Sequence, residues 1–311
     1  MAQDVWSQWL LERRFGGDSA QRDRTLARLL PIRDRVLDNA DLRPGDVLLD
    51  VGTGDGLIAF GALERLGPDG TVIMSDVSGE LLTLCREAAD RAGAGRRCRF
   101  VKAAAEDLSE VADESVDVVT TRSVLIYVTR KADALAEFYR VLRPGGRMSL
   151  YEPVNRYFGL RPPPTRWWGF DVTPVQDLAE RVRAEYDRVQ PPDASPLMDF
   201  DDRDLVRMAT DAGFNPVSLT LEVDVSRGDH WSSSWEAFLH TAPNPCLPTF
   251  AEATSRALSP EEARRLFAHL RPQLEEGRTT TASAVAFLKG RKPDPARGVG
   301  DPDRGRPRRT R

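Results

Sequence analysis

Apolar, strand-like runs and amphipathic, helix-like segments alternate five times between residues 43 and 155. The runs, among them VLLDV, TVIMSD and VDVVTT, are short, rich in β-branched residues and bounded by turn-forming residues, which is typical of buried strands. Strands that are joined through a helix run parallel to one another in a sheet. The pattern therefore predicts an α/β fold, doubly wound around a mostly parallel sheet with helices on both faces.

Further elements are expected on both sides of this core. Amphipathic periodicity predicts two helices before it, at 3–14 and 21–40. After the core the chain is less regular, and the segment 156–200 is rich in proline and aromatic residues. Strands are expected at 44–52, 71–78, 98–108, 115–128, 147–154, 215–225 and 279–290, and further helices at 57–66, 79–92, before residue 142, at 200–214 and within 231–276.

The same pattern predicts a single domain, because no linker-like segment occurs before residue 291. We expect this domain to span 1–290, with a basic tail at 291–311 that is poor in apolar residues and is therefore expected to be disordered. Its expected parts are a helical cap at 1–42, the core at 43–155, and two helical insertions at 156–213 and 231–276.

The charge distribution argues against a nucleic-acid partner. The net charge is −4 over 311 residues, and the basic tail leaves the body of the chain more acidic still. Binding to phosphates needs a basic face, so we expect no nucleic-acid ligand. No run of eighteen apolar residues is present, and the charged start MAQDVWSQWLLERRFGGD is unlike a signal peptide, so we expect neither a membrane span nor export.

The cysteines point to a reducing compartment. Cys85, Cys98 and Cys246 lie far apart, match no zinc-binding spacing and leave one thiol over if two were to pair. We therefore expect reduced thiols, no metal site and a cytoplasmic location. The many Arg, Ala and Asp residues against few Lys are typical of a bacterial chain.

The stretch LLDVGTGDGLIAF, residues 48–60, places an acidic residue and three glycines between a strand and a helix. Such a turn exposes backbone N–H groups and lets a ligand approach closely. Dinucleotide-binding turns have the spacing G-x-G-x-x-G, whereas Leu57 stands here at the position of the third glycine. Asp50 would repel a pyrophosphate and suits a ligand that carries positive charge. The structural alternative is that Asp50 and Asp76 simply cap helices.

These residues resemble the motifs of the class I S-adenosylmethionine-dependent methyltransferases, in order and over about residues 40 to 155. LLDVGTGDG resembles the first motif, VIMSDVS the second, AAAEDL the third, VDVVTTRSVLIYV the fourth and VLRPGGRMSLYEP the fifth. The resemblance implies a Rossmann-like sheet of seven strands. It also implies S-adenosyl-L-methionine as cofactor and S-adenosyl-L-homocysteine as product.

The resemblance further implies which residues contact the cofactor. Asp50 of the first motif would lie near its methionine part and the glycines against the cofactor, and the acid of the second motif would take both ribose hydroxyls. The family often has an Asp where this chain has Ala104, so Glu106 or Asp107, or backbone groups alone, must serve the adenine. The implied set is Asp50, Gly52, Thr53, Gly54, Asp76, Val77, Ala105, Glu106, Asp107 and Arg122.

The acceptor is less constrained than the cofactor. Family members that methylate adenine or amide nitrogens typically carry an (N/D)-P-P-(Y/F) sequence where this chain has TTRS, which argues against base amines. The caps contain four tryptophans that either wall a pocket or attach the caps to the body: Trp6, Trp9, Trp167 and Trp168. We expect a small-molecule acceptor, of secondary metabolism, methylated at O, N or C. A peptide or protein acceptor stays open, as does a fold that transfers no methyl group and serves as a cyclase, regulator or partner subunit.

Few residues are candidates for handling the acceptor. Tyr127 follows the fourth expected strand, Glu152 and Asn155 follow the fifth, and His230 lies beyond the sixth. We expect Tyr127, Glu152 and His230 to orient or deprotonate the acceptor, although a structural role is the alternative for the histidine.

Overall fold

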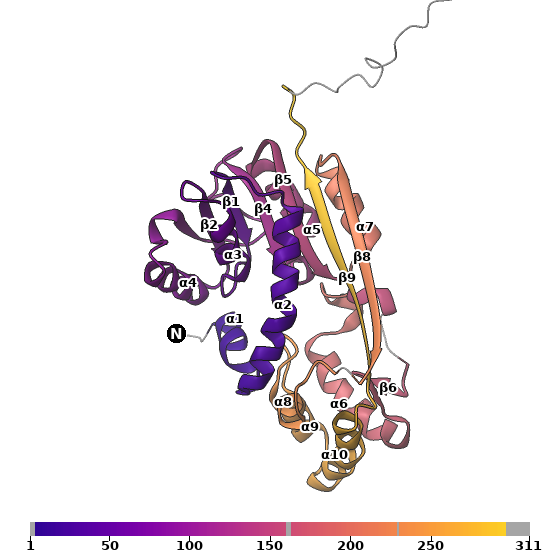
Figure 1. Cartoon of the computed structure of the whole chain (residues 1–311). Coiled ribbons are helices and arrows are strands. Elements are labelled where there is room, and N and C mark those ends of the chain that lie inside the picture. The colour runs from indigo at the N-terminus through magenta and orange to yellow at the C-terminus, as the bar shows by residue number, and fades with distance from the viewer. Residues whose placement is uncertain (1–3, 160–162, 229, 297–311) are drawn as a thin grey trace, which may run out of the picture.

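Seven strands form one sheet in the computed structural model, which describes residues 4–159, 163–228 and 230–296 (Figure 1). The order of the strands is β3-β2-β1-β4-β5-β9-β8. The first five strands of that order are mutually parallel, and β9 is antiparallel to both β5 and β8. The strands are β1 (Val47–Val51), β2 (Thr71–Asp76), β3 (Cys98–Lys102), β4 (Val116–Arg122), β5 (Leu142–Pro153), β8 (Val217–Arg227) and β9 (Thr280–Arg291). The predicted Rossmann-like, mostly parallel sheet of seven strands is confirmed.

Helices cover both faces of the sheet because successive side chains of each buried strand point to opposite faces. In β1, Leu48 packs in the cluster that includes helices α2, α3 and α4, whereas Leu49 packs in the cluster that includes α5 and α7. Every expected helix of the core is found within two residues of its predicted ends, except that α7 ends three residues before its predicted end at 214. These helices are α2 (Ser19–Asn39), α3 (Leu57–Arg65), α4 (Gly79–Arg91), α5 (Lys131–Val141) and α7 (Asp202–Asp211).

A separate group of helices lies at the lower end of the molecule in Figure 1, where the long strands β8 and β9 reach down to it. We call it the insertion lobe. It has its own apolar core, which includes Trp167, Phe238 and Phe250. The lobe contains the short strands β6 (Arg166–Trp167) and β7 (Phe170–Asp171) and the helices α6 (Gln176–Val189), α8 (Trp235–His240), α9 (Phe250–Ala257) and α10 (Pro260–Glu275). Helix α6 lies within the helical insertion expected at 156–213, although its bounds were not predicted.

The N-terminal segment folds between the sheet and the insertion lobe. Asp4 caps α1 (Val5–Gln8), which continues directly as the π-helical turn η1 (Trp9–Arg13). The side chain of Arg13 bonds Glu252 of the lobe at 2.5 Å, and Ser7 bonds Glu80 of α4. The segment therefore ties the lobe to the core.

Strand β9 extends one residue beyond the predicted end of the domain. Arg291 pairs with Arg147, and the buried ammonium of Lys292 donates to the carbonyls of Leu142 and Tyr139 at 2.8 and 3.1 Å. The predicted start of the tail at residue 291 is therefore too early. Residues 297–311 of that tail lie outside the described residues.

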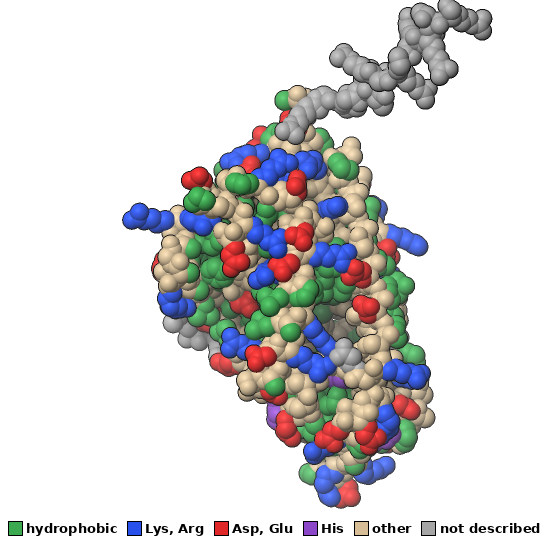
Figure 2. All heavy atoms as spheres, in the orientation of Figure 1, with side chains coloured by type: hydrophobic (Ala, Val, Ile, Leu, Met, Phe, Trp, Pro, Cys, Tyr) green, Lys and Arg blue, Asp and Glu red, His purple; other side chains and the backbone are tan. Residues whose placement is uncertain are grey.

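On the face shown in Figure 2, acidic and basic side chains are interspersed over most of the surface. Among the helices that the structure describes, none combines the length and apolar character that crossing a bilayer requires.

Candidate functional site

Two cavities meet at the carboxyl ends of the parallel strands, the edge where open α/β sheets bind ligands. The first cavity has a volume of about 390 Å³ and lies between the N-terminal segment and the ends of β1, β2 and β4. The second cavity has a volume of about 990 Å³ and lies between the core and the insertion lobe. Both cavities are lined by the same five residues, which we call the shared wall: Trp9, Arg14, Arg122, Ser123 and Tyr127.

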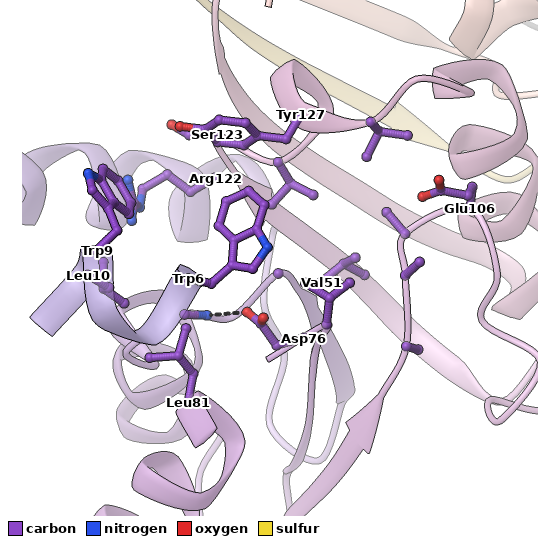
Figure 3. A pocket seen from close by; sticks show the side chains of 18 of the residues that line it. Trp6, Trp9, Leu10, Val51, Asp76, Leu81, Glu106, Arg122, Ser123 and Tyr127 are labelled. Carbon is purple, nitrogen blue, oxygen red and sulfur yellow. Dashed lines mark hydrogen bonds between the residues drawn. The ribbon is translucent and has the colours of Figure 1, made fainter. Parts of the chain in front are cut away.

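The glycine turn after β1 gives the first cavity its floor. Gly52 and Gly54 line the cavity with left-handed φ angles of +64° and +58°. A Cβ atom at Gly52 would lie 2.4 Å from a methyl carbon of Val124, so only glycine fits there. The N–H of Gly54 donates to Asp76 Oδ2 at 2.9 Å, drawn as the dashed line in Figure 3. The turn is thereby held against the end of β2.

Asp50 lies behind this turn and lines neither cavity. Its buried carboxylate accepts hydrogen bonds from the hydroxyls of Thr53 at 2.8 Å and Thr120 at 2.9 Å. Burial raises the pKa of Asp50 to about 6, and these two hydroxyls oppose that shift. The structure thus places Asp50 and Thr53 as supports of the turn, and neither lies on the cavity surface where contact with the cofactor was expected.

The other predicted cofactor residues lie on opposite sides of the first cavity. Asp76 and Val77 line it at the end of β2, and Ala105 and Glu106 line it from the loop after β3 (Figure 3). The second carboxylate oxygen of Asp76 accepts from Ser78 N at 2.9 Å, and burial raises the pKa of this carboxyl. Asp107 does not line the first cavity, whereas Ala105 and Glu106 do.

The N-terminal segment closes the first cavity on its outer side. Figure 3 shows the indole of Trp6 between Asp76 and Tyr127, with its ring edge-on to that of Tyr127 at a centroid distance of 4.9 Å. Trp9 donates from Nε1 to the carbonyl of Ala242 in the lobe at 2.9 Å. These two tryptophans therefore wall a cavity. Trp167 and Trp168 line the second cavity and also stack on each other in the lobe core, so both interpretations hold for them.

Of the three residues predicted to handle the acceptor, only Tyr127 reaches a cavity. Burial raises its pKa to about 12, so its hydroxyl stays protonated at neutral pH. It is carried by the short helix η3 (Leu125–Tyr127), next to Ser123 in the shared wall.

Glu152 is 1% exposed and lines neither cavity. Its carboxylate accepts from the backbone N–H groups of Val124, Leu125 and Ile126 at 2.9, 3.0 and 3.2 Å. Burial raises its pKa to about 7. The residue anchors the loop that presents Tyr127, which corrects its expected contact with the acceptor.

His230 is likewise internal to the lobe. It is 3% exposed, its Nδ1 accepts from Ser232 N at 3.1 Å, and its Nε2 lies 3.2 Å from the carbonyl of Trp168. The structural alternative therefore describes His230 better than a direct contact with the acceptor. Asn155, by contrast, lines the second cavity.

The sequence analysis did not single out Arg14, although it lines both cavities. The available signal was its spacing: Trp6, Leu10 and Arg14 recur every four residues and therefore lie on one helix face. Burial and, second to it, the nearby cation Arg122 lower the pKa of Arg14 to about 10. Within the described residues, no group of three His, Cys, Asp or Glu side chains is placed to hold a metal ion.

Comparison with known proteins agrees with this geometry. The profile of a methyltransferase domain matches residues 49–150. The chain is 36% identical to the nocamycin O-methyltransferase of Saccharothrix syringae over 50% of this chain and 52% of that one. It is 29% identical to a ubiquinone/menaquinone biosynthesis C-methyltransferase of Legionella pneumophila over 49% of this chain and 66% of that one. The chain spans about half the length of the curated relatives it matches.

The fold is found in solved structures as well. The YcgJ protein of Bacillus subtilis superposes with a TM-score of 0.50 at 16% identity, covering 84% of this chain and 98% of that one. The motif order, the sheet and the profile match agree, and methyltransferases of this type use S-adenosylmethionine. Residues 49–150 therefore form a methyltransferase domain with the Rossmann-like fold of the class I S-adenosylmethionine-dependent methyltransferases.

Proposed function

We propose that this chain transfers a methyl group from S-adenosylmethionine to O, N or C of a small molecule held in the second cavity. The shared wall carries this proposal, because two ligands that lie on either side of it are brought next to each other. The volumes of about 390 and 990 Å³ fall in the range of small-molecule sites, which is roughly 300–1,000 Å³.

The first cavity suits the cofactor. Asp76 is placed to accept from the ribose hydroxyls, and Gly52 and Gly54 leave room for close approach of the ligand to the backbone. Ala105 and Glu106 would contact the adenine, with Val77 beside the ribose, while Asp50 and Thr53 keep the turn in shape. When bound, the cofactor supplies a methyl group already activated by the positive sulfur. The protein then has to align the acceptor and exclude water.

Enclosure favours a small acceptor over a polymer. The N-terminal segment is tied to the lobe by the Trp9–Ala242 and Arg13–Glu252 bonds, so it covers the shared wall from outside. A covered site admits a ligand that can be engulfed and hinders a long chain. We propose that the protein acts in the cytoplasm, which the free thiols of Cys85, Cys98 and Cys246 support. We also propose that it takes part in bacterial secondary metabolism. The cap, the core and both insertions would then form a single domain.

Calorimetry tests the cofactor half of this proposal. We expect S-adenosylhomocysteine to bind at micromolar concentration and NADH not to bind, because Leu57 replaces the third glycine of dinucleotide turns. Binding of NADH without binding of S-adenosylhomocysteine overturns the proposal. A crystal structure of the complex would then locate the acceptor side: side chains that fill the space beside the sulfur would instead support a role without methyl transfer.

A further inference from the structure

The shared wall contains two arginines, Arg14 and Arg122, that no carboxylate among the described residues contacts directly; Asp55 and Asp50 act on them only through longer-range electrostatics. Among the residues that the structure describes, neither the guanidinium of Arg14 nor that of Arg122 forms a hydrogen bond or an ion pair. Arg14 instead lies over the rings of Trp9 and Phe15, at 5.3 and 5.5 Å from their centroids. Two partly buried cations that lie near each other are costly unless an anion joins them.

The cofactor does not supply enough negative charge for both. S-adenosylmethionine carries a sulfonium, an ammonium and one carboxylate, so it brings a net positive charge to this wall. Its one carboxylate can form a paired, two-pronged contact with only one guanidinium. The other guanidinium still lacks an anion.

The lining of the second cavity contains more basic than acidic side chains. Its lining includes four arginines, Arg14, Arg28, Arg122 and Arg183, against one acidic residue, Asp187. A cavity with low-dielectric walls and charges of one sign concentrates ligands of the opposite sign. The ligand that complements this cavity is therefore an anion.

The rest of the lining is aromatic and carries polar atoms without partners. The rings that line it include Trp9, Tyr127, Trp168, Tyr186 and Trp231. The hydroxyls of Tyr186 and Thr241, both residues 6% exposed, have no hydrogen-bond partner among the described residues. Buried hydroxyls of this kind are normally satisfied, so these two are unusual polar atoms in residues that line the cavity.

We propose that the acceptor is a multi-ring aromatic anion, and that its acidic oxygen, a carboxylate or an ionised hydroxyl, lies against Arg14 and Arg122 in the shared wall. This inference rests on the proposed function for the identity of the cavity as the acceptor site. It also agrees with the composition of the wall, in which no carboxylate or imidazole is present to act as a base. An oxygen that is already ionised needs no base.

Equilibrium dialysis with a charged probe and its neutral counterpart tests the inference. The probes are 2-anthracenecarboxylate and its primary amide, which share one ring system and differ in charge. In the presence of saturating S-adenosylhomocysteine, we expect the carboxylate to bind about tenfold more tightly than the amide, as a charge-assisted contact to arginine provides. Arg14→Gln and Arg122→Gln should each remove most of that preference and leave amide binding within about twofold.

Three controls make the result decisive. Arg14→Lys keeps the charge and should keep the preference, which separates lost charge from lost folding. Arg91→Gln alters an arginine on α4 whose side chain is 70% exposed and should change nothing. Calorimetric binding of S-adenosylhomocysteine to every variant monitors the proposed function separately.

The outcomes divide clearly. Equal binding of both probes, no binding of either, or a carboxylate preference that survives in the Arg14→Gln/Arg122→Gln double variant overturns the inference while cofactor binding stands. Loss of S-adenosylhomocysteine binding in the wild-type protein overturns the proposed function instead.

Discussion

Trp6 and Tyr127 meet edge to face with ring centroids 4.9 Å apart, although 121 positions separate them in the chain. Trp6 belongs to the N-terminal segment and Tyr127 to the loop after β4. The pair therefore joins the cover of the first cavity to the wall that it shares with the second. Cofactor binding should depend on this contact, because it fixes the segment that closes the cavity.

Trp6→Ala should weaken S-adenosylhomocysteine binding about three- to tenfold, since aromatic pairs contribute about 0.5–1.5 kcal/mol beyond burial. Trp6→Phe keeps an aromatic ring and should retain most of the affinity. Titration calorimetry measures both variants. Affinity unchanged in Trp6→Ala would mean that the N-terminal segment does not cover the cofactor.

Asp76→Ala should cost about 2–3 kcal/mol of S-adenosylhomocysteine binding free energy, because two charge-assisted hydrogen bonds to the ribose are lost. Asp107→Ala is the control, since Asp107 lies in the loop after β3 and lines neither cavity. Calorimetry on the folded variants compares the two. Equal losses in both would contradict the assignment of Asp76 to the ribose.

The sequence could predict the sheet and the first cavity because both follow from local patterns. The acid and the glycines from Asp50 to Gly56 lie on one continuous turn, and Asp76 ends the neighbouring strand. Parallel neighbours bring such strand ends to one edge without any further information. Spacing along the chain was thus enough to assemble Gly52, Gly54 and Asp76.

The acceptor side could not be predicted in the same way, because it depends on contacts between distant segments. Glu152 and His230 were chosen for their chemistry, yet their directions are set by backbone N–H groups and by packing in the lobe. The bounds of helix α6 were not predicted although Leu178, Val182 and Tyr186 recur at helical spacing, since the prolines on both sides of it dominate the local composition. Which side chains face a cavity between two lobes is decided only when the lobes pack.

The end of strand β9 offers a test of where the folded domain stops. Lys292→Ala should lower the free energy of unfolding by about 2 kcal/mol, because a buried ammonium and its hydrogen bonds to Leu142, Tyr139 and Glu114 are removed. Lys289→Ala, at an exposed position of the same strand, should be nearly neutral. Urea titrations compare the two variants with the wild-type protein.

Truncation extends that test. Deletion of residues 297–311, which include no large apolar side chain except valine at 299, should leave the free energy of unfolding and the cofactor affinity unchanged. Deletion of 291–311 should destabilise the protein, since it also removes Arg291 and Lys292. Equal stability of the two truncated chains would show that the domain ends before residue 291, as the sequence alone suggested.

Glu152 should make the protein less stable as the pH rises through the weakly acidic range. Burial raises its pKa from 4.5 to about 7 in the folded protein, so the unfolded chain loses this proton first. Between these two values the folded state binds more protons than the unfolded state, and the free energy of unfolding therefore falls with increasing pH. Glu152→Gln removes the titrating group and should flatten this part of the stability curve.

The same variant should be less stable overall. The carboxylate of Glu152 accepts hydrogen bonds from three backbone N–H groups, and the amide NH₂ of glutamine would face one of them as a second donor. Urea titrations at several pH values measure both effects, with Glu222→Gln, an exchange of a partly exposed carboxylate on the edge strand β8, as the control. A decline that persists unchanged in Glu152→Gln would assign the pH dependence to another group, of which Asp50, with its pKa raised to about 6, is the first to examine by Asp50→Asn.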